Sequence, residues 1–377
     1  MILLHKPSRS GRITSTLLLA SSWALLPAAL AADFKPAPQE FQQEMPRQWP
    51  APAGSSAGGL TLVDAAPDGT VRVADGQRWY TMRGDRLEVL PPPAGSTAAK
   101  GHVFVGTTVR TLSTPLSTVR HIQRQDDVVW LATTKGIVRL TATESSTELP
   151  NQAVRQIATG RAELVLAATA RGLWRRDEAD KWEQIRVVDD VGRVWAEGDV
   201  RGVAVDGQGS WWVATPAGVA RRKGDRWSFF TGRDGLPYAD FTCVAIGAGS
   251  EVWFGTHRGA VRFDGKEWAY REGQLWLPGN DVRSIAVGAD GRAWFATDKG
   301  LGCIERRAMT LAEKAAHYAQ EVERCITRTP FGYLSEVGLG APGDRSKINY
   351  SDSDNDGLWT AMYGAGECFA YAATKAP

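Results

Sequence analysis

The sequence predicts a mainly β protein, a β-propeller of about six four-stranded blades followed by a C-terminal α-helical segment. Three observations predict this fold. Gly (40 residues) and Trp (15 residues) are both abundant in the 377-residue chain, which is typical of turn-rich β proteins and not of helical bundles. A Thr-x-x-Gly segment recurs along the chain at intervals of about 40 residues, the length of a propeller blade. Four short β-like stretches accompany each clear recurrence.

The repeat is clearest at five aligned threonines. They are Thr133, Thr169, Thr215, Thr256 and Thr297, which are 36, 46, 41 and 41 positions apart. In the best unit, strands are expected at 242–246, 251–255, 259–263 and 267–270, with turn residues between them. Residues 60–305 are therefore expected to form the propeller. Five or seven blades also fit, because residues 75–128 depart from the repeat.

Residues 1–31 have the order of a signal peptide. Three basic residues and no acid lie in the first 12 positions, residues 13–30 are mostly apolar, and a small-x-small cleavage site ends at Ala31. Polar residues shorten the apolar run below the roughly 20 residues of a membrane span. We expect cleavage after Ala31, a secreted or periplasmic protein, and no membrane span in the mature chain. Residues 32–59, rich in Pro, Ala, Gln and Ser, are expected to be a flexible segment.

After residue 305 the apolar period becomes helical. Thr310 and Glu313 form a capping-box pattern, and a second helix is expected after a Gly-rich loop over 330–353. Residues 306–377 thus predict a helical segment. Two helices and a loop bury little surface alone, so we expect this segment to be the start of a larger α/α domain whose remainder lies beyond residue 377.

The segment from Trp253 to Trp268, Trp-Phe-Gly-Thr-His-Arg-Gly-Ala-Val-Arg-Phe-Asp-Gly-Lys-Glu-Trp, resembles the two-component regulator propeller repeat. The resemblance spans about residues 60–305. It implies an extracytoplasmic ligand-sensing propeller, in a family often found in carbohydrate-responsive bacteria. In that family a histidine-kinase region normally follows the propeller; residues 306–377 do not resemble one, so no signalling role is expected from the resemblance. The tryptophans of the second strands are expected to pack between blades.

Residues 355–363, Asn-Asp-Gly-Leu-Trp-Thr-Ala-Met-Tyr, followed by Cys-Phe-Ala-Tyr, resemble the opening of α/α-toroid domains of secreted carbohydrate-active proteins. This resemblance covers about 70 residues and implies glycan processing by the complete domain. The carboxylates available for acid–base chemistry of that kind are Asp354, Asp356 and Glu367.

The charge balance excludes one class of partner. The chain carries 44 Lys and Arg against 42 Asp and Glu, and three of the basic residues lie in the leader. A nearly neutral mature chain lacks the basic excess of a nucleic-acid-binding protein. The four cysteines, Cys243, Cys303, Cys325 and Cys368, contain no CxxC pair. Their disulfide state stays open, although Cys243 lies in an apolar strand typical of a protein core.

A candidate ligand-binding site follows from blade topology. The residue before the Gly of the Thr-x-x-Gly turn is basic in four of five units, at Lys135, Arg171, Arg258 and Lys299. A closed ring would place these residues around one end of the channel, where they suit an anionic glycan. The alternative is a set of solvated turn positions. Further residues expected at this end are His257, Asp234, Tyr238, Trp276 and Asp281.

A second candidate lies at Asp352-Ser-Asp-Asn-Asp-Gly357, which matches the first half of a calcium loop. Asp352, Asp354 and Asp356 would be the Ca²⁺ ligands. The twelfth loop position is Tyr363 where a bidentate Glu is needed. The alternatives are a cap for the second helix, or catalytic or substrate-binding carboxylates.

Three functions compete on these observations. The first is an extracytoplasmic ligand-binding propeller that recognises a carbohydrate and serves an attached α/α toroid. The second is the N-terminal part of a secreted glycan-processing enzyme, of glycoside hydrolase or polysaccharide lyase type. The third is a protein-interaction scaffold, which would expose apolar patches in place of a basic ring. The ligand identity and the oligomeric state stay open.

Overall fold

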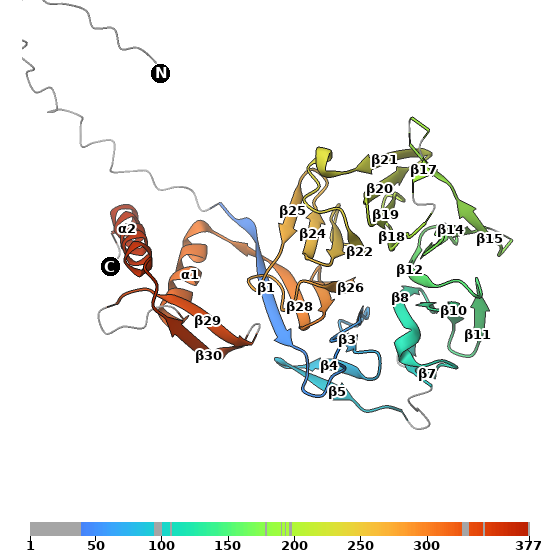
Figure 1. Cartoon of the computed structure of the whole chain (residues 1–377), viewed down its shortest axis with the longest axis horizontal. Helices are drawn as coiled ribbons and strands as arrows, with labels where there is room; N and C mark the ends of the chain where they lie inside the picture. Colours follow the sequence, from blue (N-terminus) through green and yellow to red (C-terminus); the bar gives the residue numbers. More distant parts are fainter. Residues whose placement is uncertain are drawn as a thin grey trace, which may run out of the picture.

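A computed structural model describes residues 39–93, 100–105, 108–177, 179–189, 191–192, 194–195, 198–325, 332–341 and 344–375. The predicted signal peptide, residues 1–31, lies outside the described residues. The described chain forms six four-stranded antiparallel sheets arranged as the blades of a closed ring, with the C-terminal segment at one side (Figure 1). The prediction of six four-stranded blades is therefore confirmed.

The blades follow one another along the chain. The strands of the first three are β2 (Leu62–Ala65), β3 (Val71–Ala74), β4 (Trp79–Arg83) and β5 (Arg86–Leu90); β8 (Val119–Gln125), β9 (Val128–Thr133), β10 (Gly136–Leu140) and β11 (Ser145–Glu148); and β12 (Val154–Thr159), β13 (Val165–Thr169), β14 (Gly172–Arg176) and β15 (Trp182–Ile185). Two short hairpins are inserted between blades, β6 (His102–Val105) with β7 (Thr108–Thr111), and β16 (Val187–Val188) with β17 (Val194–Trp195).

The next two blades are β18 (Gly202–Val205), β19 (Trp211–Thr215), β20 (Gly218–Lys223) and β21 (Arg226–Phe230), and then β22 (Phe241–Ile246), β23 (Val252–Thr256), β24 (Gly259–Phe263) and β25 (Trp268–Arg271). The expected strands of the best unit agree with the second set to within one residue at each end. Short 3₁₀ turns, η2 (Leu116–Thr118) and η3 (Gly232–Asp234), precede β8 and β22.

The last blade differs from the prediction. It combines β26 (Val282–Val287), β27 (Ala293–Thr297) and β28 (Gly300–Met309) with β1 (Phe41–Pro50), which pairs with β28 along its whole length (Figure 1). The expectation that residues 32–59 are flexible is thus wrong for 41–50, and the propeller continues past 305 to Met309. The Trp49 ring stacks on Trp294 at 5.7 Å between centroids, which supplies an anchor that the polar composition of the segment conceals.

The core lies between neighbouring blades. The tryptophans expected there, Trp130, Trp212, Trp253 and Trp294, are all at most 6% exposed. Aliphatic and aromatic side chains of adjacent blades surround them, so burial of the second strands drives the blades together. Cys243 belongs to the same core, as predicted.

The C-terminal segment contains α1 (Leu311–Cys325), β29 (Glu336–Ala341), β30 (Asp344–Ser351) and α2 (Asp356–Thr374). The predicted capping box is present. The Glu313 carboxylate accepts from the backbone N–H of Thr310 at 2.7 Å, and the backbone N–H of Glu313 donates to the Thr310 hydroxyl at 3.2 Å. The region expected to be a loop over 330–353 instead contains the β29–β30 hairpin. Neither helix has a buried residue. No helix in the described part of the chain is long and apolar enough to cross a membrane.

Candidate functional site

The two ends of the ring are set by strand direction. Phe241, at the start of β22, pairs with Thr256 at the end of β23, whereas Ile246 pairs with Val252. The Thr-x-x-Gly turns therefore lie beside the starts of the first strands. We call this the turn end of the ring, and the opposite end the far end.

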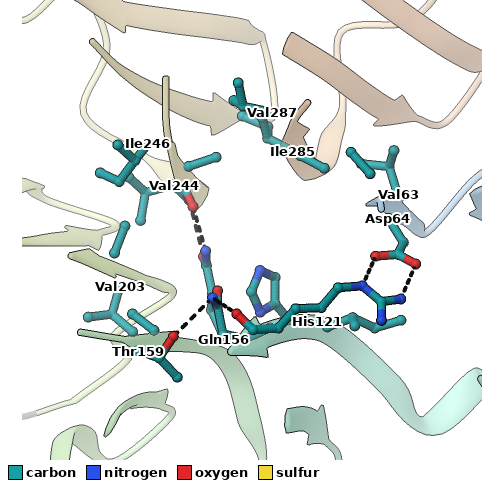
Figure 2. Close-up of a pocket in the computed structure, with 18 of the residues that line it drawn as sticks. Val63, Asp64, His121, Gln156, Thr159, Val203, Val244, Ile246, Ile285 and Val287 are labelled. Atoms are coloured by element: carbon teal, nitrogen blue, oxygen red, sulfur yellow. Dashed lines mark hydrogen bonds and ion pairs between the residues drawn. The ribbon is translucent and has the colours of Figure 1, made fainter. Parts of the chain in front are cut away.

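The central channel contains a pocket of about 280 Å³, lined by the first strands of all six blades (Figure 2). The lining residues lie in the middle and last parts of these strands, and include Ala65, Thr159, Ile246 and Val287 near the strand ends. The pocket therefore extends from the middle of the channel to the far end.

A buried ion pair forms one side of the pocket. The Arg124 Nε and a terminal nitrogen donate to the two carboxylate oxygens of Asp64 at 3.1 and 2.6 Å. The remaining terminal nitrogen of Arg124 donates to the Phe104 carbonyl at 2.8 Å. Arg72 lies further away, 3.9 Å from Asp64. Both carboxylate oxygens and all three guanidinium nitrogens thus have partners inside the protein.

Neutral polar side chains line the same side of the pocket. The Gln123 side-chain amide donates to the Thr159 hydroxyl (3.1 Å) and to the Arg124 carbonyl (3.0 Å). The His121 ring lies in the pocket (Figure 2), and its Nδ1 faces the Ile157 N–H at 3.5 Å. Loss of hydration inside the channel lowers the pKa of His121 to about 4. The imidazole is therefore neutral near pH 7, with Nδ1 as acceptor and Nε2 as donor.

A buried side chain crosses between blades at the inner limit of this pocket. Gln156 of β12 donates to the Val244 carbonyl of β22 and accepts the Val244 N–H at 3.1 Å (Figure 2). It passes over Gly202 of the intervening blade. A Cβ at Gly202 would lie 2.9 Å from the Gln156 oxygen and 3.0 Å from the Val244 nitrogen. The glycine therefore makes room for the bridge.

The Thr-x-x-Gly turns share one geometry. In each, the threonine hydroxyl donates to the glycine carbonyl and accepts the N–H of the residue before the glycine. For Thr256 these distances are 2.8 Å and 2.9 Å, the second to Arg258. The same pair of bonds positions Lys135, Arg171 and Lys299. All four basic side chains are exposed at the turn end.

Three acidic groups at the turn end have cationic partners, whereas Asp298, beside Lys299, has no ion pair with a described residue. Asp199 pairs with Arg155 and with Arg201 (3.1 Å), and Arg201 also pairs with Asp240 (2.7 Å). Asp281 pairs with Arg283 at 2.9 Å. None of the ion pairs between described residues involves Lys135, Arg171, Arg258 or Lys299.

The other residues predicted at this end have individual roles. His257 Nδ1 lies 2.7 Å from Asp281, so the structure brings these two together. Asp234 caps η3, where it accepts from the Thr231 N–H at 2.9 Å. Arg271 lies over the Trp276 ring at 4.5 Å, and Trp276 packs on the blade core. Tyr238 is half-buried near Tyr270.

The three acidic residues predicted as Ca²⁺ ligands follow one another from the end of β30 to the first turn of α2. Asp352 and Asp354 are exposed, and Asp356 in the first turn of α2 accepts from the Ser335 hydroxyl at 3.1 Å. Glu367 is exposed beside Tyr363, whose pKa is raised by burial and by this carboxylate. The described residues contain no group of three or more His, Cys, Asp or Glu side chains that could hold a metal ion.

Sequence reasoning missed the channel residues. Asp64 lies in the apolar run Leu62–Ala65, where a charged residue is an unusual feature that could have marked it. His121, Gln123 and Gln156 carried no comparable signal, because their partners lie on other blades.

Comparison with known proteins gives one family match. The family described as "Two component regulator propeller" matches residues 277–299, which confirms the predicted resemblance for that segment. A search of curated proteins found no match.

Solved structures share the fold at low identity. The extracellular domain of a hybrid two component system from B. thetaiotaomicron is 15% identical, with a TM-score of 0.53 over 68% of this chain and 39% of that one. A second structure from that organism, titled as a one component system, is 14% identical, with a TM-score of 0.54 over 68% and 40%. Inactive virginiamycin B lyase from Staphylococcus aureus is 13% identical, with a TM-score of 0.53 over 71% and 99%.

This chain therefore spans only about 40% of the two extracellular domains. At these identities the likeness shows the fold alone. The chain is a six-bladed propeller with a match to the two component regulator propeller family at residues 277–299.

Proposed function

We propose that this chain is an extracytoplasmic ligand-binding propeller that binds an anionic glycan at the turn end. One observation carries the proposal: four exposed basic side chains are repeated at the same turn of different blades and have no ion pairs with described residues, while Asp199, Asp240 and Asp281 at the same end are paired with other cations. Unpaired cations around one end of a ring create a local positive potential in a nearly neutral protein. Sulfate or carboxylate groups of a glycan would supply the missing partners.

Two further points support the extracytoplasmic setting. The sequence begins with the charge and hydropathy order of a signal peptide. The same fold occurs in the extracellular domains described above.

Calorimetry with oligogalacturonate and with an uncharged oligosaccharide of equal length tests the proposal. Oligogalacturonate should bind, and raising the salt from 0.1 M to 1 M should weaken it, because the Debye length falls from about 10 Å to about 3 Å. The double variant Arg258→Glu/Lys299→Glu should lose binding without loss of stability, since exposed turn charges contribute little to folding.

The matched control is Lys181→Glu/Lys266→Glu. It makes the same change of charge at exposed turn residues of the far end. If both double variants bind oligogalacturonate equally well, or if the uncharged oligosaccharide binds as tightly, the basic residues are only solvated turn positions.

The C-terminal segment favours a second candidate, an enzyme in which this segment begins an α/α toroid. Several large apolar side chains on its helices are exposed, including Leu311 (72%), Trp359 (46%) and Phe369 (77%). Such side chains are normally covered by other parts of a protein. Release of shortened glycan products, lost in Asp354→Asn/Glu367→Gln, would support the enzyme. If no product is released from acidic or neutral polysaccharides, the result favours the ligand-binding propeller over the enzyme.

A further inference from the structure

The channel pocket has two unlike sides. Polar side chains come from the first three blades, at Asp64, His121, Gln123, Arg124, Gln156 and Thr159. The opposite side comes from β18, β22 and β26 and contains only Val, Ile and Ala residues. A molecule in this pocket would meet hydrogen-bonding groups on one side and hydrocarbon on the other.

The pocket offers no unpaired charge to a ligand. Three of the five N–H groups of Arg124 are used by Asp64 and by the Phe104 carbonyl, and the Asp64 carboxylate neutralises its charge, so an anion meets no net positive charge there. The Asp64 carboxylate is matched in turn by Arg124, so a cation meets no net negative charge there. Because His121 is neutral near pH 7, it does not change this balance.

Neutral hydrogen-bonding capacity does remain. The Thr159 hydroxyl accepts from Gln123, which leaves its own hydrogen to donate. With His121 Nδ1 turned to the Ile157 N–H, its Nε2–H is the second donor. Among the described residues, neither donor has a protein acceptor. The carbonyl oxygen of the Gln123 side chain is an acceptor on the same side.

The volume limits the size of an occupant. About 280 Å³ is room for roughly nine waters at about 30 Å³ each. It lies just below the range of about 300–1,000 Å³ that is usual for drug-sized ligands. A single polyhydroxylated ring can replace such waters through its hydroxyl groups and place its C–H face on the aliphatic side.

We propose that the far end of the channel is a second ligand site, which binds one uncharged monosaccharide-sized polyol between the Thr159–His121 side and the Val and Ile side. The residues that line this site lie in the middle and last parts of the first strands, away from the Thr-x-x-Gly turns, so the site does not rest on the proposed binding of anionic glycans. Occupancy requires no change of charge in the protein and no metal ion.

Ligand-observed NMR and titration of the full chain test this site. The probes are methyl glucoside, methyl galactoside and N-acetylglucosamine, with glucuronate and glucosamine as charged counterparts. At least one neutral sugar should bind, and the charged sugars should bind at least tenfold more weakly. Thr159→Val keeps the side-chain shape and removes the hydrogen bond to the ligand together with the one from Gln123, so it should weaken binding about threefold to tenfold.

Controls separate this site from the turn end. Thr147→Val changes an exposed threonine of the outer strand β11 and should leave binding unchanged. Arg258→Glu/Lys299→Glu should also leave it unchanged. His121→Phe keeps a planar ring, removes the Nε2 donor, and serves if Thr159→Val is unstable. If no neutral sugar binds the folded chain, or if neither channel variant weakens binding, the pocket holds only water and the proposal is overturned.

Discussion

Glu44 of β1 lies 2.7 Å from the Arg262 guanidinium of β24, so the N-terminal strand is ion-paired to the neighbouring blade as well as hydrogen-bonded within its own. Its other carboxylate oxygen pairs with Arg271 at 2.6 Å. Arg262 in turn pairs with Glu251 at 2.5 Å. Glu44 and Glu251 are each only 6–8% exposed. This cluster fixes the place where the ring closes.

We expect Glu44→Ala to destabilise the propeller by about 3 kcal/mol, because it removes the ion pair of Arg271 and one of the ion pairs of the buried Arg262. Urea unfolding at constant pH measures the change. Glu40→Ala, at an exposed position before β1, is the control and should change stability by less than about 0.5 kcal/mol. If Glu44→Ala unfolds at the same urea concentration as the wild type, the ion pairs of Glu44 make no net contribution to stability.

The lowered pKa of His121 predicts a pH dependence of stability. The unfolded chain binds this proton near the ordinary value of 6.5, whereas the folded chain binds it only near 4. Stability should therefore fall as the pH drops from 6.5 to 4, by up to about 3 kcal/mol from this group, and be unaffected by it at higher pH. In His121→Phe the slope over this range should be smaller. An identical slope in the variant would assign the acid sensitivity to the carboxylates.

Gly202→Ala should disturb the bridge between Gln156 and Val244. The added Cβ has no room on the path of the Gln156 side chain, and displacement would leave its buried polar atoms unpaired, at about 1–3 kcal/mol. Thermal unfolding gives the cost. Gly207→Ala, at a glycine with open space around it, is the control. If Gly202→Ala and Gly207→Ala unfold at the same temperature, the bridge accommodates the added methyl group without loss of stability.

Thr256→Val should reduce both order and binding at the turn end. The variant keeps the shape but loses the two hydrogen bonds that hold the turn and Arg258, so we expect a loss of about 1–3 kcal/mol in stability. Affinity for oligogalacturonate should fall along with it. Thr147→Val is again the control. Unchanged affinity in a destabilised Thr256→Val would show that Arg258 needs no fixed turn.

Thiol labelling should divide the four free cysteines into two classes. Burial raises the pKa of Cys243 and of Cys303 to about 12, so both should be inert in the folded protein. Cys368 is exposed and Cys325 is partly exposed, so these should react first. If mass spectrometry shows that all four cysteines are modified rapidly, the blades open readily.

The sequence predicted the blades well because each is a local unit. The strands β22 to β25 were placed within one residue because apolar positions, turn residues and the Thr-x-x-Gly segment lie close together in the chain. β1 was missed because its residues pair with residues of β28 that lie 250 or more positions away in the chain, and no local pattern indicates such pairing. The same holds for Gln156 and Val244, which meet only because two blades flank a third.

The C-terminal segment also shows what local sequence patterns can and cannot predict. Thr310 and Glu313 were predicted correctly because a helix cap involves residues three apart. The hairpin of β29 and β30 was hidden by glycines, which weaken strand propensity. The basic residues of the turn end were placed on the correct type of turn, and their binding role stays a prediction.

The pairing of β1 with β28 also has a consequence for biogenesis. During synthesis the strand at 41–50 emerges early, and its partner at 300–309 follows only after the other five blades. Until then the two facing edges expose backbone groups that can pair with other chains. Closure is a contact of high sequence separation, which is intrinsically slow. A nascent chain would thus stay open to aggregation, or to protection by a chaperone, until its last blade is complete.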